Sequence, residues 1–176
     1  MIDVRRLAPD DAAGAASWDA FVHACPQATF FHRAAWQGLI RDVFRHETHY
    51  LMATRDGVVE GVLPLARVHS RLFGHALTSL PFAVYGGVAA SSEEAAQALE
   101  AEAQRIAQQA GVDHLELRHV SPRHADWPTQ DLYVTFRKEI LPEVEANMLA
   151  IPRKQRAMVR KGIKNGLTST IDADVD

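Results

Sequence analysis

The residues best suited to do chemistry form one basic segment near the end of the chain. Six of the nineteen Lys and Arg residues lie between Arg153 and Lys164, and no acidic residue interrupts them. The other thirteen basic residues are set against twenty-two acidic residues, so the excess of positive charge is confined to this segment. A charge run usually forms a solvated face, but like charges three and four residues apart repel in a helix, and no acid here relieves them. The segment therefore predicts an anionic partner.

Helix signals bound this segment and predict one basic helix over residues 152–166. Pro152 suits the first helical position, where its missing N–H would have no intrahelical acceptor. Asn165-Gly166 suits a left-handed C-terminal cap. The apolar residues between these signals are Ala157, Met158, Val159 and Ile163. They form a strip, so we expect the helix to dock on the rest of the protein by one face.

The anion contacts can be assigned within the basic helix. Arg153 and Lys154 lie in its first turn, where backbone N–H groups have no intrahelical partner and the helix dipole favours negative charge. Arg156 follows one turn later, and a guanidinium can bind a phosphate group through two hydrogen bonds. We therefore expect Lys154 and Arg156 to anchor a phosphate or diphosphate, with Arg153 and Arg160 as supporting charges.

Two further candidates lie earlier in the chain. In Tyr85-Gly86-Gly87 the glycines either relieve a bend, with the tyrosine at the edge of the core, or let the backbone and the phenol contact a ligand. Both interpretations remain open from the residues alone. Trp36 lies with Leu39, Ile40 and Val43 on the apolar face of a helix expected over residues 33–44. Tryptophan in such a place more often belongs to the core.

Composition bounds the class of protein. A chain of 176 residues with 47% hydrophobic and 23% charged residues is typical of one globular domain. His46-Glu47-Thr48-His49 is not a zinc-protease motif, no other histidine pair has metal-ligand spacing with a third partner, and Gly-x-Ser-x-Gly, Walker and GxGxxG motifs are absent. Cys25 is the single cysteine, and no apolar run approaches the roughly 20 residues that cross a bilayer. We expect a cytoplasmic protein without a metal site.

The secondary-structure elements that must position these residues are predicted from the periodicity of apolar residues and from helix-capping and turn residues. Strands are expected over residues 2–7, 46–54, 58–68, 75–80, 112–117, 132–136 and 167–171. Helices are expected over residues 11–24, 33–44, 91–110, 142–150 and 152–166. Asp56-Gly57 is suited to a two-residue type I′ turn between the second and third strands. Helices packed on a mixed, largely antiparallel sheet are therefore expected, an α/β (α+β) protein.

Several short motifs in order resemble FemAB-like proteins, most closely the branch associated with PEP-CTERM and exopolysaccharide gene clusters. They are Thr29-Phe30-Phe31-His32 followed by Trp36, Tyr50-Leu51 with Leu63-Pro64-Leu65, Leu72-Phe73-Gly74, Leu80-Pro81-Phe82, Tyr85-Gly86-Gly87, Leu115-Glu116-Leu117-Arg118, and Arg153-Lys154-Gln155-Arg156 with Arg160-Lys161-Gly162. The likeness covers nearly the whole chain, but only the N-terminal half of such a protein.

The resemblance implies a fold and an activity. Fem proteins have two domains similar to GNAT N-acyltransferases and transfer an aminoacyl or acyl group to an amine, so residues 1–176 would form one GNAT-like domain. The counterparts of Tyr85-Gly86-Gly87 and of Arg153-Lys154-Gln155-Arg156 lie beside a nucleotide-sugar diphosphate. This half would bind the acceptor and hold no cofactor. An aminoacyl-tRNA or acyl-CoA donor would use the missing half, toward which the basic helix leads, and the fragment alone would be inactive.

The sequence departs from the family in two places. Ile40 and Arg41 stand near the position of a lysine found in peptidoglycan-modifying members, so the resemblance does not extend to their acceptor. A coenzyme A pyrophosphate loop is absent, and no general base can be named. Two alternatives from other classes remain: a nucleic-acid-binding module with tRNA among its candidate partners, and a non-catalytic interaction domain, each using the basic helix.

Overall fold

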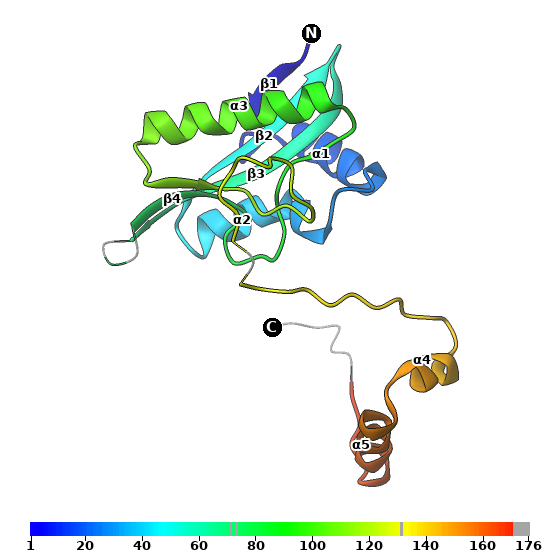
Figure 1. The fold of residues 1–176 in the computed structure, drawn as a ribbon. Coiled ribbons are helices and arrows are strands. Elements are labelled where there is room, and N and C mark those ends of the chain that lie inside the picture. The colour runs from blue at the N-terminus through cyan, green and yellow to red at the C-terminus, as the bar shows by residue number, and fades with distance from the viewer. Residues whose placement is uncertain (71, 73, 131, 171–176) are drawn as a thin grey trace. The chain divides into compact units, whose positions relative to one another are not determined.

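The computed structural model describes residues 1–70, 72, 74–130 and 132–170, and it has two compact units, Met1–Trp127 and Pro128–Asp176. The first unit holds a sheet with helices on both faces, and the second holds two helices (Figure 1). Among the described residues, no helix has the length and apolar character to cross a membrane.

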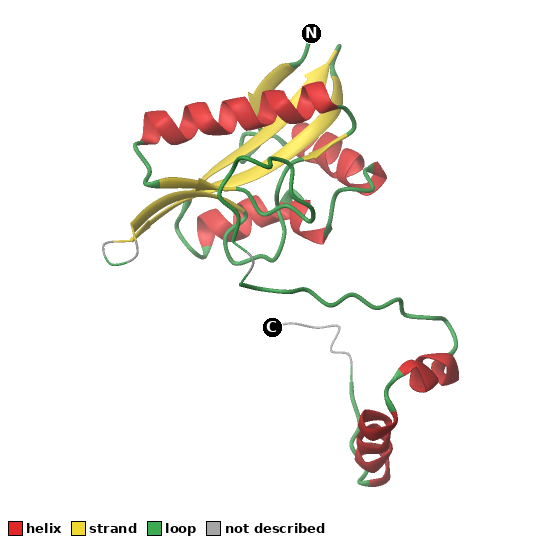
Figure 2. Ribbon diagram, viewed as in Figure 1, coloured by secondary structure: helices red, strands yellow, loops and turns green. Residues whose placement is uncertain are grey.

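The sheet of the first unit is mixed and mainly antiparallel (Figure 2). Its strands are β1 Asp3–Arg6, β2 Glu47–Arg55, β3 Val58–Ser70, β4 Gly74–Ser79, β5 Ala89–Ala90 and β6 His114–Glu116, in the order β1-β2-β3-β4-β6, with β5 paired to β3. Among the described strands only β4 and β6 are parallel; Thr78 lies opposite Glu116, so both strands have their carboxyl ends at the same edge of the sheet. The predicted fold class is confirmed.

The β2–β3 hairpin is confirmed together with its turn. Asp56 and Gly57 have φ angles of 50° and 82°, as a type I′ turn requires at both central positions. Because that turn matches the right-handed twist of strands, the register holds along the hairpin, with one irregularity between Ala53 and Thr54. The hairpin is the scaffold on which both cores are built.

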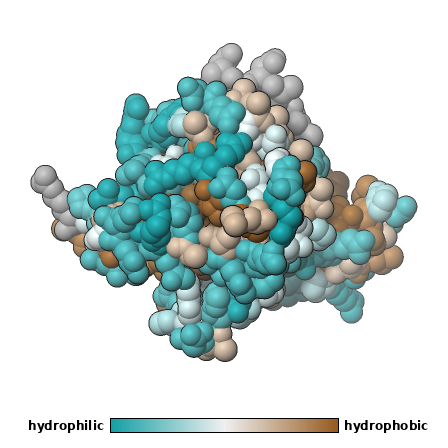
Figure 3. All heavy atoms as spheres, turned by 90° about the horizontal axis from the view of Figure 1, so that it is seen from above, coloured by the Kyte–Doolittle hydropathy of each residue, from teal (hydrophilic) through white to brown (hydrophobic). Residues whose placement is uncertain are grey.

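Helices cover both faces of this sheet (Figure 1). The helix α3, Glu93–Ala110, buries Leu99 and Ile106 against the β2–β3 hairpin; each such side chain contributes about 1.5–3 kcal/mol by leaving water. The Ser92 hydroxyl caps its start and Gly111, at φ 59°, ends it, as predicted. Seen from the α3 side, the surface is mostly hydrophilic (Figure 3).

The opposite face carries α1, Ala12–Ala24, the short 3-10 helix η1, Phe30–His32, and α2, Ala35–Asp42. Trp18 of α1 is fully buried and stacks on Tyr50 of β2, with 5.2 Å between ring centroids. Asp11 caps α1 by accepting a hydrogen bond from the Gly14 amide at 2.7 Å. The predicted strand–helix–helix start of the chain is therefore confirmed.

The buried face of α2 differs from the prediction. Ile40 is buried as expected, but Leu39 is 41% exposed and Val43 is 63% exposed. The second buried residue of the helix is Gln37, whose side-chain amide donates to the Leu7 carbonyl at 3.0 Å. A buried hydrogen bond thus sets the rotation of α2, and a reading based on apolar residues alone misses it.

The second unit contains α4, Val144–Ala150, and α5, Arg153–Lys164. The strand predicted over residues 132–136 is absent, and so is a strand over residues 167–170; residue 171 lies outside the described residues. Within the described part of this unit no neighbouring strand exists to accept their backbone hydrogen bonds, and β propensity alone does not make a strand.

Candidate functional site

The basic helix α5 forms with the caps that the sequence predicts. Pro152 precedes its first turn, and Gly166 has a φ angle of 76°. The Gly166 amide donates to the Ile163 carbonyl at 3.0 Å, and the Leu167 amide donates to the Gly162 carbonyl at 3.2 Å. This pair of bonds is a Schellman motif, which satisfies carbonyls at the helix end.

The expectation that α5 docks on the rest of the protein by its apolar face stays a prediction. Within the second unit Met158 is 63%, Val159 is 40% and Ile163 is 68% exposed, and no residue of α5 is buried. The apolar strip exists, but no described part of its own unit packs on it.

Arg156 is already engaged within its own unit. Its Nε donates to the Ile151 carbonyl at 3.3 Å, and its Nη2 donates to the Ile151 and Leu149 carbonyls at 3.2 and 3.4 Å. These carbonyls end α4, so the guanidinium fastens the corner between α4 and α5. Arg153, Lys154 and Arg160 are exposed and have no hydrogen bond or ion pair within the described residues.

The loop that carries Tyr85-Gly86-Gly87 connects the end of β4 to β5 and is held by its backbone. The amides of Gly86 and Gly87 both donate to the Arg118 carbonyl, at 3.2 and 2.9 Å. A Cβ atom on Gly86 would lie 2.7 Å from Cβ of Leu80, and one on Gly87 would lie 2.4 Å from the ring of His119. The two glycines are thus explained by close packing, and a ligand contact by this loop stays a prediction.

Arg118 is the residue that fixes the loop. Its backbone amide donates to the Ser79 hydroxyl at 2.7 Å, and its guanidinium donates to the Leu80 and Ala83 carbonyls at 3.3 and 2.7 Å. Leu80 and Phe82 have φ angles of 37° and 66°, a region that side-chain-bearing residues rarely adopt. Such residues cost about 1–3 kcal/mol each and persist where surrounding contacts impose them.

His32 holds the same loop from the other side. Its Nδ1 accepts a hydrogen bond from the Thr29 amide at 3.0 Å, so its Nε2 carries the proton and donates to the Gly87 carbonyl at 2.8 Å. Burial lowers the pKa of His32, because the charged ring would lose its hydration. His32 is therefore a neutral positioning residue.

A buried carboxylate lies on the α3 side of this loop, and its partners were not predicted from the sequence. Glu100 is 3% exposed; Arg123 Nε lies 2.8 Å from its Oε1, and His124 Nε2 lies 3.0 Å from its Oε2. His119 Nε2 is 4.0 Å from Oε1, too far for a hydrogen bond. The one visible signal is an acid placed in the buried stripe of a helix that is otherwise Ala, Leu and Ile.

His119 is the group in this cluster that can accept a proton. Burial is the largest influence on its pKa and lowers it, whereas the Glu100 carboxylate acts in the opposite direction. Its Nε2 is buried and has no hydrogen-bond partner within the described residues. A neutral imidazole with an unused nitrogen next to a carboxylate is suited to general-base chemistry. The described residues contain no group of three or more His, Cys, Asp and Glu arranged to hold a metal.

Trp36, the remaining residue predicted from the sequence, lies apart from the cluster around Glu100. Trp36 is half-buried, donates from its Nε1 to the Phe30 carbonyl at 3.3 Å, and packs against Phe30 and Phe31 with ring centroids 5.8 Å apart in both pairs. Its contacts are those of a packing residue at the junction of η1 and α2. The basic residues of α5 belong to the second unit.

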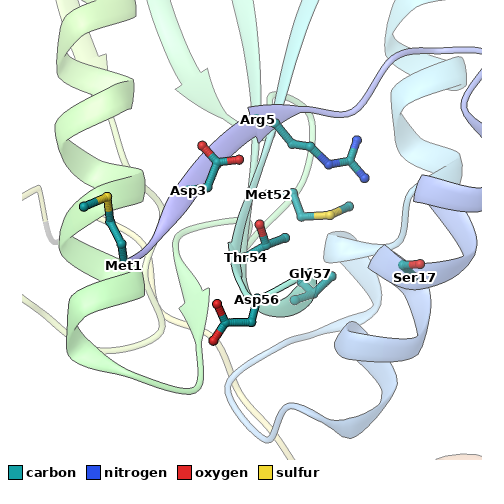
Figure 4. A pocket seen from close by; sticks show the side chains of 9 residues that line it. Met1, Asp3, Arg5, Ser17, Met52, Thr54, Asp56 and Gly57 are labelled. Carbon is teal, nitrogen blue, oxygen red and sulfur yellow. The ribbon is translucent and has the colours of Figure 1, made fainter.

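A pocket of about 570 Å³ lies at the turn of the β2–β3 hairpin, between β1 and α1 (Figure 4). It is lined by Met1, Asp3, Arg5, Ser17, Met52, Thr54, Asp56, Gly57 and Val59. None of the residues predicted from the sequence lines it. Its acidic side chains do not suit the expected anionic ligand.

Comparison with known proteins rests on structure alone. No family model and no curated protein matches the sequence. A GNAT family acetyltransferase from Staphylococcus aureus subsp. aureus USA300_TCH1516 has a TM-score of 0.51 and 10% identity, covering 79% of this chain and 98% of its own.

Two further solved structures are similar at lower scores. A ribosomal-protein-alanine N-acetyltransferase from Brucella melitensis biovar Abortus 2308 has a TM-score of 0.48 and 16% identity, covering 77% of this chain and 100% of its own. A transcriptional regulator from Bacillus halodurans C-125 has a TM-score of 0.47 and 11% identity, covering 100% of this chain and 99% of its own. The sheet order, the parallel β4–β6 pair and the similarity to the staphylococcal protein together identify the fold as that of the GNAT acetyltransferases.

Proposed function

We propose that this chain is a domain of an acyltransferase that moves an acyl or aminoacyl group to an amine. The observation that carries the proposal is the GNAT-type sheet, with a fixed loop and a buried His119–Glu100 pair next to the carboxyl ends of its two parallel strands. Ligands of sheets with parallel strands bind outside these carboxyl ends, where loops rather than strands meet.

The reaction needs one proton acceptor. As the amine nitrogen attacks the acyl carbonyl, a nitrogen–carbon bond forms and the bond from that carbon to the donor's oxygen or sulfur breaks. The amine gives up a proton, and the departing oxygen or sulfur takes one. His119 offers a free ring nitrogen for the first transfer, and the Glu100 carboxylate stabilises the imidazolium that results. A positioned base of this kind contributes about 10²–10⁴-fold to a rate.

The finer proposal is a Fem-like role in cell-envelope or exopolysaccharide biosynthesis. The acceptor would be a nucleotide-sugar or another diphosphate, bound by Arg153, Lys154 and Arg160, whose charges are exposed and unpaired within the described residues. Arg156 would act mainly through the α4–α5 corner. The chain would be the N-terminal domain of a two-domain protein, and the second domain would receive an aminoacyl-tRNA or acyl-CoA.

An assay of transfer tests the proposal. Labelled acetyl-CoA and aminoacyl-tRNA are each supplied with an amine-bearing nucleotide-sugar, to this chain and to the product of the complete gene. We expect turnover only with the complete product, and a loss of about 10²-fold or more in His119→Gln. His114→Gln, a substitution of an exposed histidine on β6, is the matched control. Full activity in His119→Gln would rule out the assigned base, and no transfer from any donor would rule out the function.

A further inference from the structure

The helix α5 has two chemically opposite faces, and within the second unit both are exposed. On a wheel of 3.6 residues per turn, the six basic residues fall on one side of the helix. The other side carries Met158, Val159 and Ile163, with only Gln155 and Gly162 between them. The apolar side continues beyond the helix in Leu167, which is 74% exposed. A 12-residue helix thus presents an apolar strip bordered by basic residues.

Exposed apolar residues also occur on the neighbouring helix of the same unit. Val144 is 75% exposed and Leu149 is 65% exposed, and no residue of α4 is buried. Because Arg156 ties the end of α4 to α5, the two helices form one hydrogen-bonded corner. The apolar surface therefore belongs to the α4–α5 corner, and the described residues of the second unit leave it uncovered.

The two faces together restrict the partner. A nucleic acid would neutralise the basic residues but would leave the apolar strip in water, and no aromatic residue lies within α5 to stack on bases. An apolar protein surface would cover the strip but would not pair the charges. The surface of an anionic membrane meets both requirements, because acyl chains take the apolar side while lipid headgroups pair with Lys and Arg at its border.

We propose that α5 docks on an anionic lipid surface, lying in the plane of the interface. The helix is about 18 Å long, well short of the hydrocarbon core of a bilayer, so it lies on the membrane and does not span it. Four to eight clustered Lys and Arg on an amphipathic helix are typical of such contacts, and α5 carries six. The proposal does not depend on acyl transfer.

Vesicle sedimentation of the full chain tests this proposal. The vesicles are phosphatidylcholine alone or phosphatidylcholine with about a third phosphatidylserine, at low and at raised salt. Lys161→Gln/Lys164→Gln removes two basic residues that are not assigned to the acceptor site, and its control is Arg6→Gln/Arg45→Gln in the first unit. Val159→Gln/Ile163→Gln removes the apolar strip, and its control is Leu39→Gln/Val43→Gln, two exposed apolar residues of the α2 segment. Glutamine keeps helix propensity nearly constant at these sites.

The proposal expects binding only to the phosphatidylserine vesicles, weakened by salt. Each basic residue near such a surface is worth roughly fivefold in affinity, so the double lysine variant should bind roughly 25-fold more weakly. The Val159→Gln/Ile163→Gln variant should lose most binding, and both controls should bind as wild type. Absence of vesicle binding would overturn the proposal. So would vesicle binding that ignores the apolar substitutions, or binding of tRNA but not of vesicles.

Discussion

At the scale of single residues, the partners of a side chain decide which chemistry it is available for. Arg156 and Arg160 are one turn apart in the same basic run, yet only Arg156 has partners, the carbonyls at the end of α4. These carbonyls would otherwise face water without an intrahelical donor. The acceptor contacts therefore fall more naturally on Arg153, Lys154 and Arg160.

Arg156→Ala should loosen the second unit. Losing hydrogen bonds from a half-exposed guanidinium to two carbonyls should cost about 0.5–1.5 kcal/mol of local stability, measured by hydrogen exchange of the α4 and α5 amides. The melting temperature of the first unit should not change. Arg160→Ala is the matched control and should leave exchange within about 0.5 kcal/mol of wild type. Equal exchange in both variants would show that the corner does not depend on Arg156.

Buried histidines should make the first unit sensitive to mild acid. Burial is the largest cause that lowers the pKa of His32, His49 and His119 below the ordinary value of a histidine, about 6.5. Below about pH 6.5 the unfolded chain therefore binds more protons than the folded chain, so stability is complete above this pH and falls as the pH drops. Each such histidine contributes up to about 1.4 kcal/mol per pH unit.

Urea unfolding at pH 7.5, 6.5 and 5.5 measures this loss. His49→Leu is the informative variant: both ring nitrogens of His49 lack hydrogen-bond partners within the described residues, although Glu47 Oε1 lies 3.3 Å from Nε2. Burial outweighs this contact in its effect on the pKa of His49, because the contact lacks hydrogen-bond geometry. The variant should lose stability less steeply between pH 6.5 and 5.5. If stability fell as steeply with pH in the variant as in wild type, folding would not shift the pKa of His49.

At the scale of elements, the sequence predicted those whose signals are local. The Asp56-Gly57 hairpin and α3, with its Ser92 start and Gly111 end, depend on contacts between near neighbours in the chain. The strand predicted over residues 132–136 depends on a partner strand, which the described residues of its unit do not offer. Which face of α2 is buried depends on the hydrogen bond from the Gln37 side chain to the Leu7 carbonyl, thirty residues away in the sequence.

The β4–β5 loop gives a test at this scale. Gly87→Ala would place a methyl group 2.4 Å from the His119 ring and 3.0 Å from the Arg118 backbone, so the loop or the buried cluster must shift. Overpacking of this kind costs about 1–3 kcal/mol in the free energy of unfolding.

Gly38→Ala is the control for this change, because a Cβ there meets only the Asp42 carboxylate at 3.9 Å, inside a helix. It should stabilise the protein by about 0.5–1 kcal/mol. Denaturant unfolding of both variants measures the contrast. Wild-type stability in Gly87→Ala would show that the loop has room for the added methyl group. Close packing would then no longer explain the glycine, and a ligand contact by the loop backbone would become the better explanation.

At the scale of the whole molecule, the chain consists of two units that differ in how they are stabilised. The first has two apolar cores on either face of the sheet, whereas no residue of α4 or α5 is buried. Tyr133 is 90% exposed and Phe136 is 92% exposed in the segment that leads to α4. Limited chymotrypsin digestion should therefore cut near these two residues first.

The large product of that digestion should keep the far-UV spectrum and melting temperature of the first unit, since its cores lie within residues 1–127. A fragment that melts early or is degraded at once would show that the two units stabilise each other.

The candidate site was only partly predictable, because some of its residues are neighbours in the sequence and others are brought together only by the fold. The basic residues of α5 are adjacent in sequence and could be found by counting charge. Glu100 and His119 are nineteen positions apart and come near each other only because α3 leads from β5 to β6, and the segment after β6 returns beside the helix. The sequence alone does not show that the Glu100 and His119 side chains lie close together, so no general base could be assigned before the fold was known.

The central claim is that this domain holds an anionic acceptor through the start of α5, and calorimetric titration tests it most directly. UDP-N-acetylglucosamine and inorganic pyrophosphate are titrated into wild type, Arg153→Ala/Lys154→Ala, and the control Arg6→Ala/Arg45→Ala. Each charge-assisted hydrogen bond lost costs about 1.5–3 kcal/mol, so the first variant should bind at least roughly 10-fold more weakly while the control binds as wild type. Wild type that binds neither probe, or equal affinity in both double variants, would contradict the claim.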